Sequence, residues 1–184
     1  MDTQALERYL NSFGKYIVKQ ARTKLTKGKK NVSKKLYNSI RYEVTADNNG
    51  FTVDFFMSSY AKFLDKGVSG TQAKRRYKDY KGQTKSSPYS YKNREGHSQP
   101  PSKALDRWIV KRGIAPRDEK GKFMSRKSIS FLIARSIGRK GIQGISFFQK
   151  PLMLGLKKFG KEMLGAIKED ILNTLDKETI TQIK

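Results

Sequence analysis

Few residues in this chain have side chains that could do acid, base or metal chemistry. It has one histidine, His97, and no cysteine, which excludes histidine triads, two-histidine metal sites, thiolate metal sites and cysteine nucleophiles. Asp79-Tyr80-Lys81 has the acid-x-lysine form of some metal-dependent nucleases, and Asp54 or Asp65 could supply a second carboxylate. That chemistry needs rigid strands around Mg²⁺, and Asp79 lies where we expect none. We therefore expect no enzymatic activity, cofactor or metal site, and keep the nuclease as a third hypothesis.

Two short glycine patterns could bring backbone N–H groups close to a phosphate. They are Gly67-Val68-Ser69-Gly70 and Gly138-Arg139-Lys140-Gly141. The first does not connect a strand to a helix, and neither ends in the Gly-Lys-Ser/Thr of a P-loop. The sequence therefore predicts a turn or a helix end at each pattern, and no nucleotide site.

The segment 71–101 differs in composition from the rest of the chain. It has no Ile, Leu, Val, Met, Phe or Trp, but it carries four tyrosines and eight lysines or arginines. Ordering a backbone costs roughly 1 to 2 kcal/mol per residue, whereas full burial of four tyrosines returns only about 10 kcal/mol. We therefore expect an extended or mobile basic arm that is ordered by a neighbouring subunit, a partner or a nucleic acid.

Cationic and aromatic side chains alternate within this arm, in the order Lys74, Arg75, Arg76, Tyr77, Lys78, Tyr80 and Lys81. Proteins that bind single-stranded nucleic acid combine such side chains, because cations follow the phosphates and rings stack on the bases. The same composition suits an arm that wraps an acidic protein surface. The sequence leaves both interpretations open.

The charge of the chain is strongly positive. Forty lysines and arginines oppose 16 acidic residues, which gives a formal net charge of +24. Residues 61–127 alone carry 19 basic and 6 acidic residues. Such a field attracts polyanions and makes free subunits repel one another. It favours nucleic acid or an acidic protein surface as the partner, and solubility is the plainer explanation.

Regular apolar patterns precede the arm. Apolar residues at steps of three or four predict a helix over 3–27, capped by Asp2 or Thr3. Ser33 can cap a short helix, after which alternating apolar residues on both sides of the turn 47–50 predict a β-hairpin. Two strands are marginal alone, so this sheet must pack on the first helix or gain further strands.

Helical patterns follow the arm. A short helix begins at Ser102, and residues 117–127 form a second basic loop. We expect the next helix to begin at Ser128 and to end at Gly138, and a long last helix to begin near Pro151.

Together these elements predict an α+β fold. It has a long N-terminal helix, a small antiparallel sheet built on the hairpin, and several helices including a long C-terminal one, with the basic arm inserted. We expect a single domain over residues 1–184. The first twenty residues contain no signal-peptide core, and no apolar run has the length of a membrane helix, so we expect a soluble protein without a membrane partner.

Three local patterns occur in the same order as in a known protein family. Residues 33–40 read Ser-Lys-Lys-Leu-Tyr-Asn-Ser-Ile, residues 60–67 read Tyr-Ala-Lys-Phe-Leu-Asp-Lys-Gly, and residues 133–148 combine Ile-Ala-Arg-Ser-Ile, a glycine-rich turn and Ser-Phe-Phe. They resemble the hairpin entry, the Tyr-Ala-x-aromatic-x-Glu-x-Gly segment and the Pro-Phe-Phe helix entry of the tail-completion or neck proteins of tailed bacteriophages. Lys34, Asp65 and Ser146 stand where that family has Gly, Glu and Pro.

This resemblance implies a structural virion protein that forms a homo-oligomeric ring at the head-to-tail junction, as a neck, connector or tail-completion component. It implies portal or connector and tail proteins as partners, genome DNA passing through the ring, and assembly in the bacterial host cytoplasm. The implied oligomer or partner interface comprises Tyr60, Phe63, Asp65, Gly67, Phe147 and Phe148. For these residues core packing is the alternative, and a basic nucleic-acid-binding accessory protein is the alternative function.

Mutual repulsion between subunits of charge +24 opposes their association. We therefore expect the ring to form readily only on an acidic docking surface or around DNA.

Overall fold

The computed structural model describes residues 4–47, 50–92 and 98–182, and for Lys161 and residues 173–182 it describes the backbone alone. Its elements are, in chain order, α1 (Gln4–Lys27), α2 (Lys35–Ser39), β1 (Arg41–Asp47), β2 (Gly50–Phe56), α3 (Ala61–Lys66), β3 (Arg76–Lys78), β4 (Thr84–Ser86), the 3₁₀ helix η1 (Ser102–Leu105), α4 (Asp106–Lys111), α5 (Arg126–Lys140) and α6 (Gln149–Gln182). The fold is α+β with a long N-terminal helix and a small antiparallel sheet, which confirms the predicted class.

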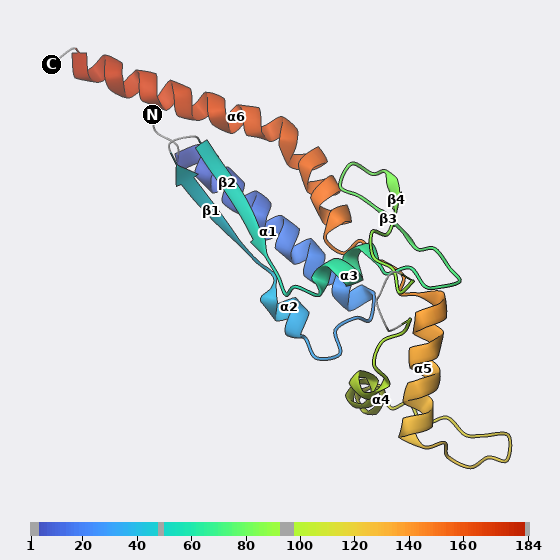
Figure 1. Ribbon diagram of the computed structural model, residues 1–184. Helices are drawn as coiled ribbons and strands as arrows, with labels where there is room; N and C mark the ends of the chain where they lie inside the picture. Colours follow the sequence, from blue (N-terminus) through green and yellow to red (C-terminus); the bar gives the residue numbers. More distant parts are fainter. Residues whose placement is uncertain (1–3, 48–49, 93–97, 183–184) are drawn as a thin grey trace.

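Figure 1 shows an elongated molecule. Helix α1 and the first part of α6 lie side by side, and the hairpin β1–β2 covers α1. Helices α4 and α5 form a separate lobe at the opposite end from the far end of α6. We call residues 98–140 the lobe and residues 162–182 the α6 tail.

Helices α1 and α6 form the main helical interface. The buried face of α1 repeats every four residues at Phe13, Ile17, Ala21 and Leu25. On α6, the ring of Phe159 packs against Tyr9, Phe13 and Tyr16 with centroid distances of 5.6, 5.6 and 5.4 Å. The Tyr9 hydroxyl donates a hydrogen bond to the Phe159 carbonyl. Aromatic contacts and this part-buried hydrogen bond therefore help to hold the two helices together.

Gly155 marks the closest approach of α6 to α1. A Cβ at this position would overlap the Ile17 side chain and would lie 3.1 Å from Cε2 of Phe13. Gly160 and Gly165, further along the same helix, face open space. The packing against α1 therefore explains one of these three helix-weakening glycines and not the other two.

The N-terminus of α1 is capped by a residue from the other end of the chain. Asp170, on α6, is 2% exposed, and its two carboxylate oxygens accept hydrogen bonds from the backbone N–H groups of Ala5 and Leu6, both at 2.9 Å. These donors have no partner within the helix, and a negative charge is favourable at a helix N-terminus. The sequence predicted Asp2 or Thr3 as the cap; both lie outside the described residues.

We expect Asp170→Ala to lower the free energy of unfolding by about 2 to 3 kcal/mol, because it leaves two backbone donors without their acceptor. Urea unfolding followed by circular dichroism measures the change. Asp170→Asn keeps one acceptor and should cost less. Glu169→Ala, at the exposed neighbouring position, is the matched control, and an equal loss in both alanine variants would contradict the capping role.

The hairpin and α1 enclose one hydrophobic core. Strands β1 and β2 pair in an antiparallel register that places Tyr42 opposite Phe55 and Val44 opposite Val53. The half-buried face of the hairpin lies against α1, and the other face is exposed. The buried core cluster comprises Val18, Ala21, Leu25, Leu36, Ile40, Ala61 and Phe147. In the described part of the chain, the two strands pair only with each other.

Several predicted helix ends lie elsewhere. Helix α5 is capped by Ser125, whose hydroxyl accepts the Ser128 N–H at 3.1 Å, so it begins earlier than predicted. It also continues through Gly138 to end at Gly141, where φ is +72°. The predictions were wrong by three residues because both serines and both glycines fit the local rules. Of the two glycines, Gly141 is the one with the positive φ that ends the helix.

The lobe buries little apolar surface. Ile109, Ile129 and Ala134 are its buried apolar side chains, whereas Phe123, Phe131 and Leu132 are 59%, 49% and 50% exposed. In the second basic loop, the Arg117 guanidinium lies 3.9 Å from the centroid of the Phe123 ring.

Among the described residues, no helix is both long and apolar enough to cross a membrane.

Candidate functional site

The two glycine patterns lie against each other. Val68 and Ile142 exchange both backbone hydrogen bonds at 2.8 Å and form an antiparallel bridge. A Cβ on Gly67 would lie 2.6 Å from the nitrogen of Gly144, so the two backbones meet without room for a side chain. We call this contact of residues 67–70 with residues 138–144 the glycine crossing. Close packing of one backbone segment against the other therefore explains why glycines occupy these positions.

Asp65 joins the glycine crossing to the start of α6. It is 5% exposed, and its Oδ1 accepts hydrogen bonds from the backbone N–H of Phe148 at 2.8 Å and of Gln149 at 3.4 Å. Its carbonyl accepts the N–H of Ser146 at 3.0 Å. Burial raises the pKa of the Asp65 carboxyl, and the hydrogen bonds from α6 oppose that rise only in part. Asp65 therefore caps α6 from within the same chain.

The other predicted interface residues divide into two groups. Phe147 is fully buried, Gly67 lies in the glycine crossing, and Phe148 packs on Phe55 with a centroid distance of 5.3 Å. These residues pack within the chain, which is the alternative that the sequence left open. Tyr60 and Phe63 are 40% and 38% exposed and are available to a partner. Their role as partner contacts stays a prediction.

The arm carries an element that the sequence did not predict. Strands β3 and β4 form a small antiparallel hairpin. The backbone N–H of Ser69 bonds the Tyr89 carbonyl at 2.8 Å, and the N–H of Tyr91 bonds the Ser69 carbonyl at 2.9 Å. Within residues 71–92, the arm is thus hydrogen-bonded to its own chain: to the glycine crossing, and through the N–H groups of Lys78 and Tyr80 to Ser146 and Gln149. Residues 93–97, including His97, lie outside the described residues.

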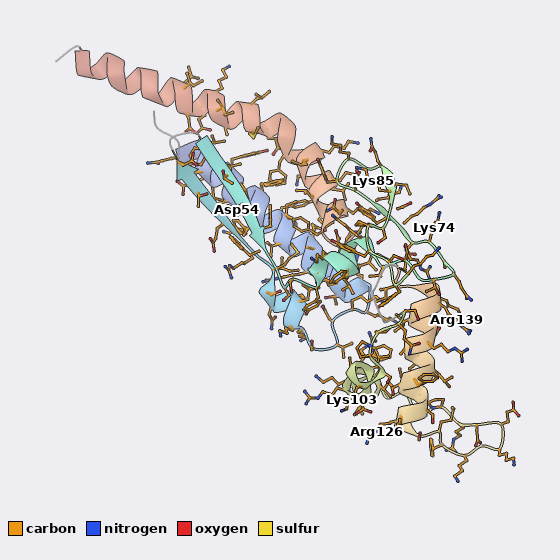
Figure 2. All side chains as sticks on the ribbon, viewed as in Figure 1. Asp54, Lys74, Lys85, Lys103, Arg126 and Arg139 are labelled. Atoms are coloured by element: carbon orange, nitrogen blue, oxygen red, sulfur yellow. The ribbon has the colours of Figure 1, made fainter. Side chains whose placement is uncertain are left out.

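The cationic side chains of the arm are mostly free of the body. Lys74, Arg76, Lys78, Tyr80 and Lys81 are exposed. Arg75 is the exception, because its Nε donates to the Lys140 carbonyl at 2.7 Å. Tyr77 is half-buried, with the Lys66 ammonium 5.8 Å from the centroid of its ring. Figure 2 shows Lys74 on this side of the molecule.

Asp79 organises the tip of the β3–β4 hairpin. It is 3% exposed, and its Oδ1 accepts the backbone N–H groups of Lys81 and Gln83, both at 2.9 Å. Its Oδ2 pairs with the Lys85 ammonium at 2.8 Å. This ammonium is the main cause of a lowered pKa of the Asp79 carboxyl. Asp79 is thus the centre of a turn, and its ammonium partner is Lys85 rather than the Lys81 of the acid-x-lysine pattern.

The lowered pKa of Asp79 predicts how the hairpin depends on pH. An acid whose pKa is lower in the folded state stabilises that state above its unfolded pKa of 3.8, and this contribution is lost as the pH falls through the folded pKa. The protection of the Lys81 and Gln83 amides, measured as exchange rates relative to those of an unfolded chain at the same pH, should therefore fall in acid before the helices open. Lys85→Met removes the ammonium alone and should shift this loss of protection to higher pH; an unchanged profile would contradict the ion pair's role.

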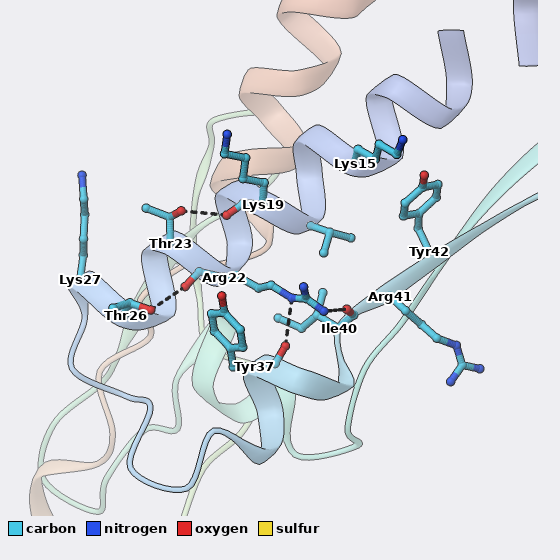
Figure 3. Close-up of a pocket in the computed structure, with 11 residues that line it drawn as sticks. Lys15, Lys19, Arg22, Thr23, Thr26, Lys27, Tyr37, Ile40, Arg41 and Tyr42 are labelled. Atoms are coloured by element: carbon cyan, nitrogen blue, oxygen red, sulfur yellow. Dashed lines mark hydrogen bonds between the residues drawn. The ribbon is translucent and has the colours of Figure 1, made fainter. Parts of the chain in front are cut away.

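A basic groove lies between α1, α2 and β1 (Figure 3). It has a volume of about 760 Å³ and is lined by Lys15, Val18, Lys19, Arg22, Thr23, Thr26, Lys27, Tyr37, Ile40, Arg41 and Tyr42, with no acidic residue among them. Arg22 donates to the carbonyls of Tyr37 and Ile40 at 3.1 and 2.9 Å and so holds α2 against α1. The lysines are free to meet an anion, because no ion pair involves them in the described residues.

The sequence did not predict this groove. The spacing of Lys15 and Lys19 places them on one face of α1, and that signal is visible in the sequence. The other wall, formed by Tyr37 and Arg41, depends on how α2 and the hairpin dock on α1. Only the fold brings these residues together.

The carboxylates of the nuclease hypothesis have other roles. Asp65 caps α6, Asp79 binds Lys85, and Asp54 lies on the exposed face of β2. Over the described ranges, no cluster of three or more His, Cys, Asp or Glu side chains could hold a metal ion.

Comparison with known proteins gives no relative: no protein-family model, curated protein or solved structure matches this chain.

Proposed function

We propose that this chain is a structural subunit of a tailed-phage virion that assembles as a ring at the head-to-tail junction, in a neck, connector or tail-completion position. Its partners are further copies of itself and the portal, connector or tail proteins, and DNA passes through the ring. It has no catalytic role, and it assembles in the cytoplasm of the bacterial host.

One observation carries the proposal. The three segments that resemble the phage family are far apart in sequence but supply one core: Leu36 and Ile40 come from the first, Ala61 from the second and Phe147 from the third. Asp65 of the second segment then caps the helix that the third segment begins. Because all three motifs contribute to one core, they help to specify a single fold. This supports a resemblance between the whole fold and the phage family, beyond the three short motifs.

The monomer also leaves surfaces that a neighbour would complete. Strands β1 and β2 have no further strand partner in the described residues, and two-stranded sheets are marginal in water. Leu156, Met163 and Leu164 of α6 are 47%, 38% and 70% exposed. Exposed apolar side chains on a long helix are typical of a protein that is part of an assembly.

Sedimentation velocity with and without short duplex DNA tests the ring. Because subunits of charge +24 repel, we expect monomers in the pure protein at low salt and one closed species of defined size on the polyanion. Stable rings without any partner would contradict the need for a template. A continuous range of complexes without a preferred size would contradict ring formation.

The basic groove favours a second candidate, a nucleic-acid-binding accessory protein. Lys15, Lys19 and Lys27 lie along one wall, and their Cα atoms span about 18 Å at 1.5 Å per residue. A duplex presents about five phosphates per strand over that length, at 3.4 Å per phosphate. Diffuse attraction to a phosphate backbone fits such lysines better than reading of bases.

Fluorescence anisotropy with labelled duplex DNA at several salt concentrations tests the groove. Lys15→Gln combined with Lys19→Gln should weaken binding and reduce the slope of log affinity against log salt by about 0.9 per lost phosphate contact. Lys111→Gln, in the lobe, is the control. Equal effects of the groove and control substitutions would show that only the overall charge attracts DNA.

A further inference from the structure

The acidic residues of this basic protein gather at one end. Residues 42–60, which contain the β1–β2 hairpin, hold three acidic and no basic residues, and the α6 tail holds five acidic and two basic residues. Half of the 16 acidic residues therefore lie in these two segments. Figure 1 places the end of β1, the start of β2 and the α6 tail at the same end of the molecule. We call these two segments the acidic end.

The lobe, at the opposite end, has the reverse composition. Residues 98–140 hold 12 basic and three acidic residues. Figure 2 shows Lys103 and Arg126 in the lobe, far from Asp54 on the hairpin. On α5, Lys127, Phe131 and Arg135 follow at steps of four, so that two cations flank an exposed ring along one ridge.

Both ends expose apolar side chains beside these charges. Ile171 and Leu172 of the α6 tail are 42% and 49% exposed. On the lobe, Phe131 and Leu132 are 49% and 50% exposed and line a groove of about 430 Å³ together with Lys127. On α6, Glu162, Glu169 and Leu172 share a ridge, because seven and three residues separate them. An acidic ridge with leucine therefore matches a basic ridge with phenylalanine.

We infer that the acidic end of one copy docks on the lobe of the next copy, with the α6 tail against α5. The two surfaces face opposite ends of one elongated molecule, so a chain cannot join its own two ends without refolding (Figure 1). Different faces meet in such a contact, which makes it heterologous and able to close into a ring. The local attraction of opposite charges also offsets part of the repulsion between whole subunits. That this contact closes into a ring rests on the proposed function; the contact between two copies does not.

Disulfide trapping tests the contact directly, because the chain has no native cysteine. Leu172→Cys and Phe131→Cys are both at exposed positions and should leave folding intact. Mixed under oxidising conditions at about 0.3 M salt, where the Debye length is shorter than about 8 Å, they should form a tail-to-lobe heterodimer. Ser12→Cys, exposed on α1, is the control partner for each. A heterodimer yield no higher than that of the controls would overturn the inference, and so would dominant Leu172→Cys homodimers.

Charge reversal tests the complementarity. Adding Glu162→Lys and Glu169→Lys to the tail variant should lower the heterodimer yield about tenfold, and adding Lys127→Glu and Arg135→Glu to the lobe variant should restore it. A yield that depends only on the net charge of each chain would contradict the assigned pairing. If trapping succeeds but no ring forms on DNA, the proposed function fails alone; if rings form without this trapping, the interface assignment fails alone.

Discussion

Replacing Gly141 by alanine should lower the free energy of unfolding by about 3 to 5 kcal/mol, the range of changes caused by combined backbone strain and steric overlap. Gly141 has φ of +72°, and a Cβ would overlap the Val68 carbonyl and lie 2.5 Å from the nitrogen of Gly70. Both obstacles are backbone atoms, which cannot move aside as a flexible side chain can. The substitution should therefore separate the two segments of the glycine crossing and release the arm that is hydrogen-bonded to it.

Gly121 is a matched control for this substitution. Its φ is +76°, and no atom lies within 4 Å of the position a Cβ would take. Gly121→Ala therefore adds the strain of a left-handed backbone alone, about 1 to 2 kcal/mol. Urea unfolding of both variants measures the difference between them. An equal loss would mean that the close backbone contact has no energetic role.

Replacing Asp65 by alanine should lower the free energy of unfolding by about 2 to 4 kcal/mol, because two backbone N–H groups at the start of α6 lose a buried acceptor. Asp65→Asn keeps the volume and one acceptor and should cost about half as much. Asp54→Ala, on the exposed face of β2, should change stability by less than about 0.5 kcal/mol. A loss in Asp65→Ala as small as that in Asp54→Ala would contradict its role as the cap of α6.

The raised pKa of Asp65 gives a pH signature with a definite sign. Its folded pKa lies above its unfolded value, so the proton is bound more tightly in the folded state. This contribution to stability is complete below the unfolded pKa and is lost as the pH rises through the folded pKa. Asp65→Asn cannot ionise. Its stability relative to the wild type should therefore improve as the pH rises through that window, and a change in the opposite direction would contradict the pKa shift.

The long helices and the first hairpin were predictable from the sequence because local patterns determine them. The four-residue repeat of Phe13, Ile17, Ala21 and Leu25 identifies one face of α1. Alternation in residues 42–55 identifies the strands, and the turn between them fixes their pairing. Each of these signals lies within a window of a few turns or a few strand residues, so no tertiary knowledge is needed.

Contacts between distant segments were not predictable in the same way. Nothing in the sequence links Asp170 to the N–H groups of Ala5 and Leu6, or pairs Gly67 with Gly144. The arm illustrates the same limit: its composition indicates that something else must order it, and in the structure other segments of the same chain, the glycine crossing among them, do so for residues 71–92. Composition shows the deficit of apolar residues but does not identify the surface that compensates for it.

Electron cryo-microscopy of purified phage particles would show the proposed ring itself. We expect a closed ring of density at the head-to-tail junction in which every subunit shows two long rods side by side, matching α1 and α6, with the α6 tail of one subunit against α5 of the next. Particles whose junction contains no density of this shape, and from which mass spectrometry does not recover the chain, would contradict it.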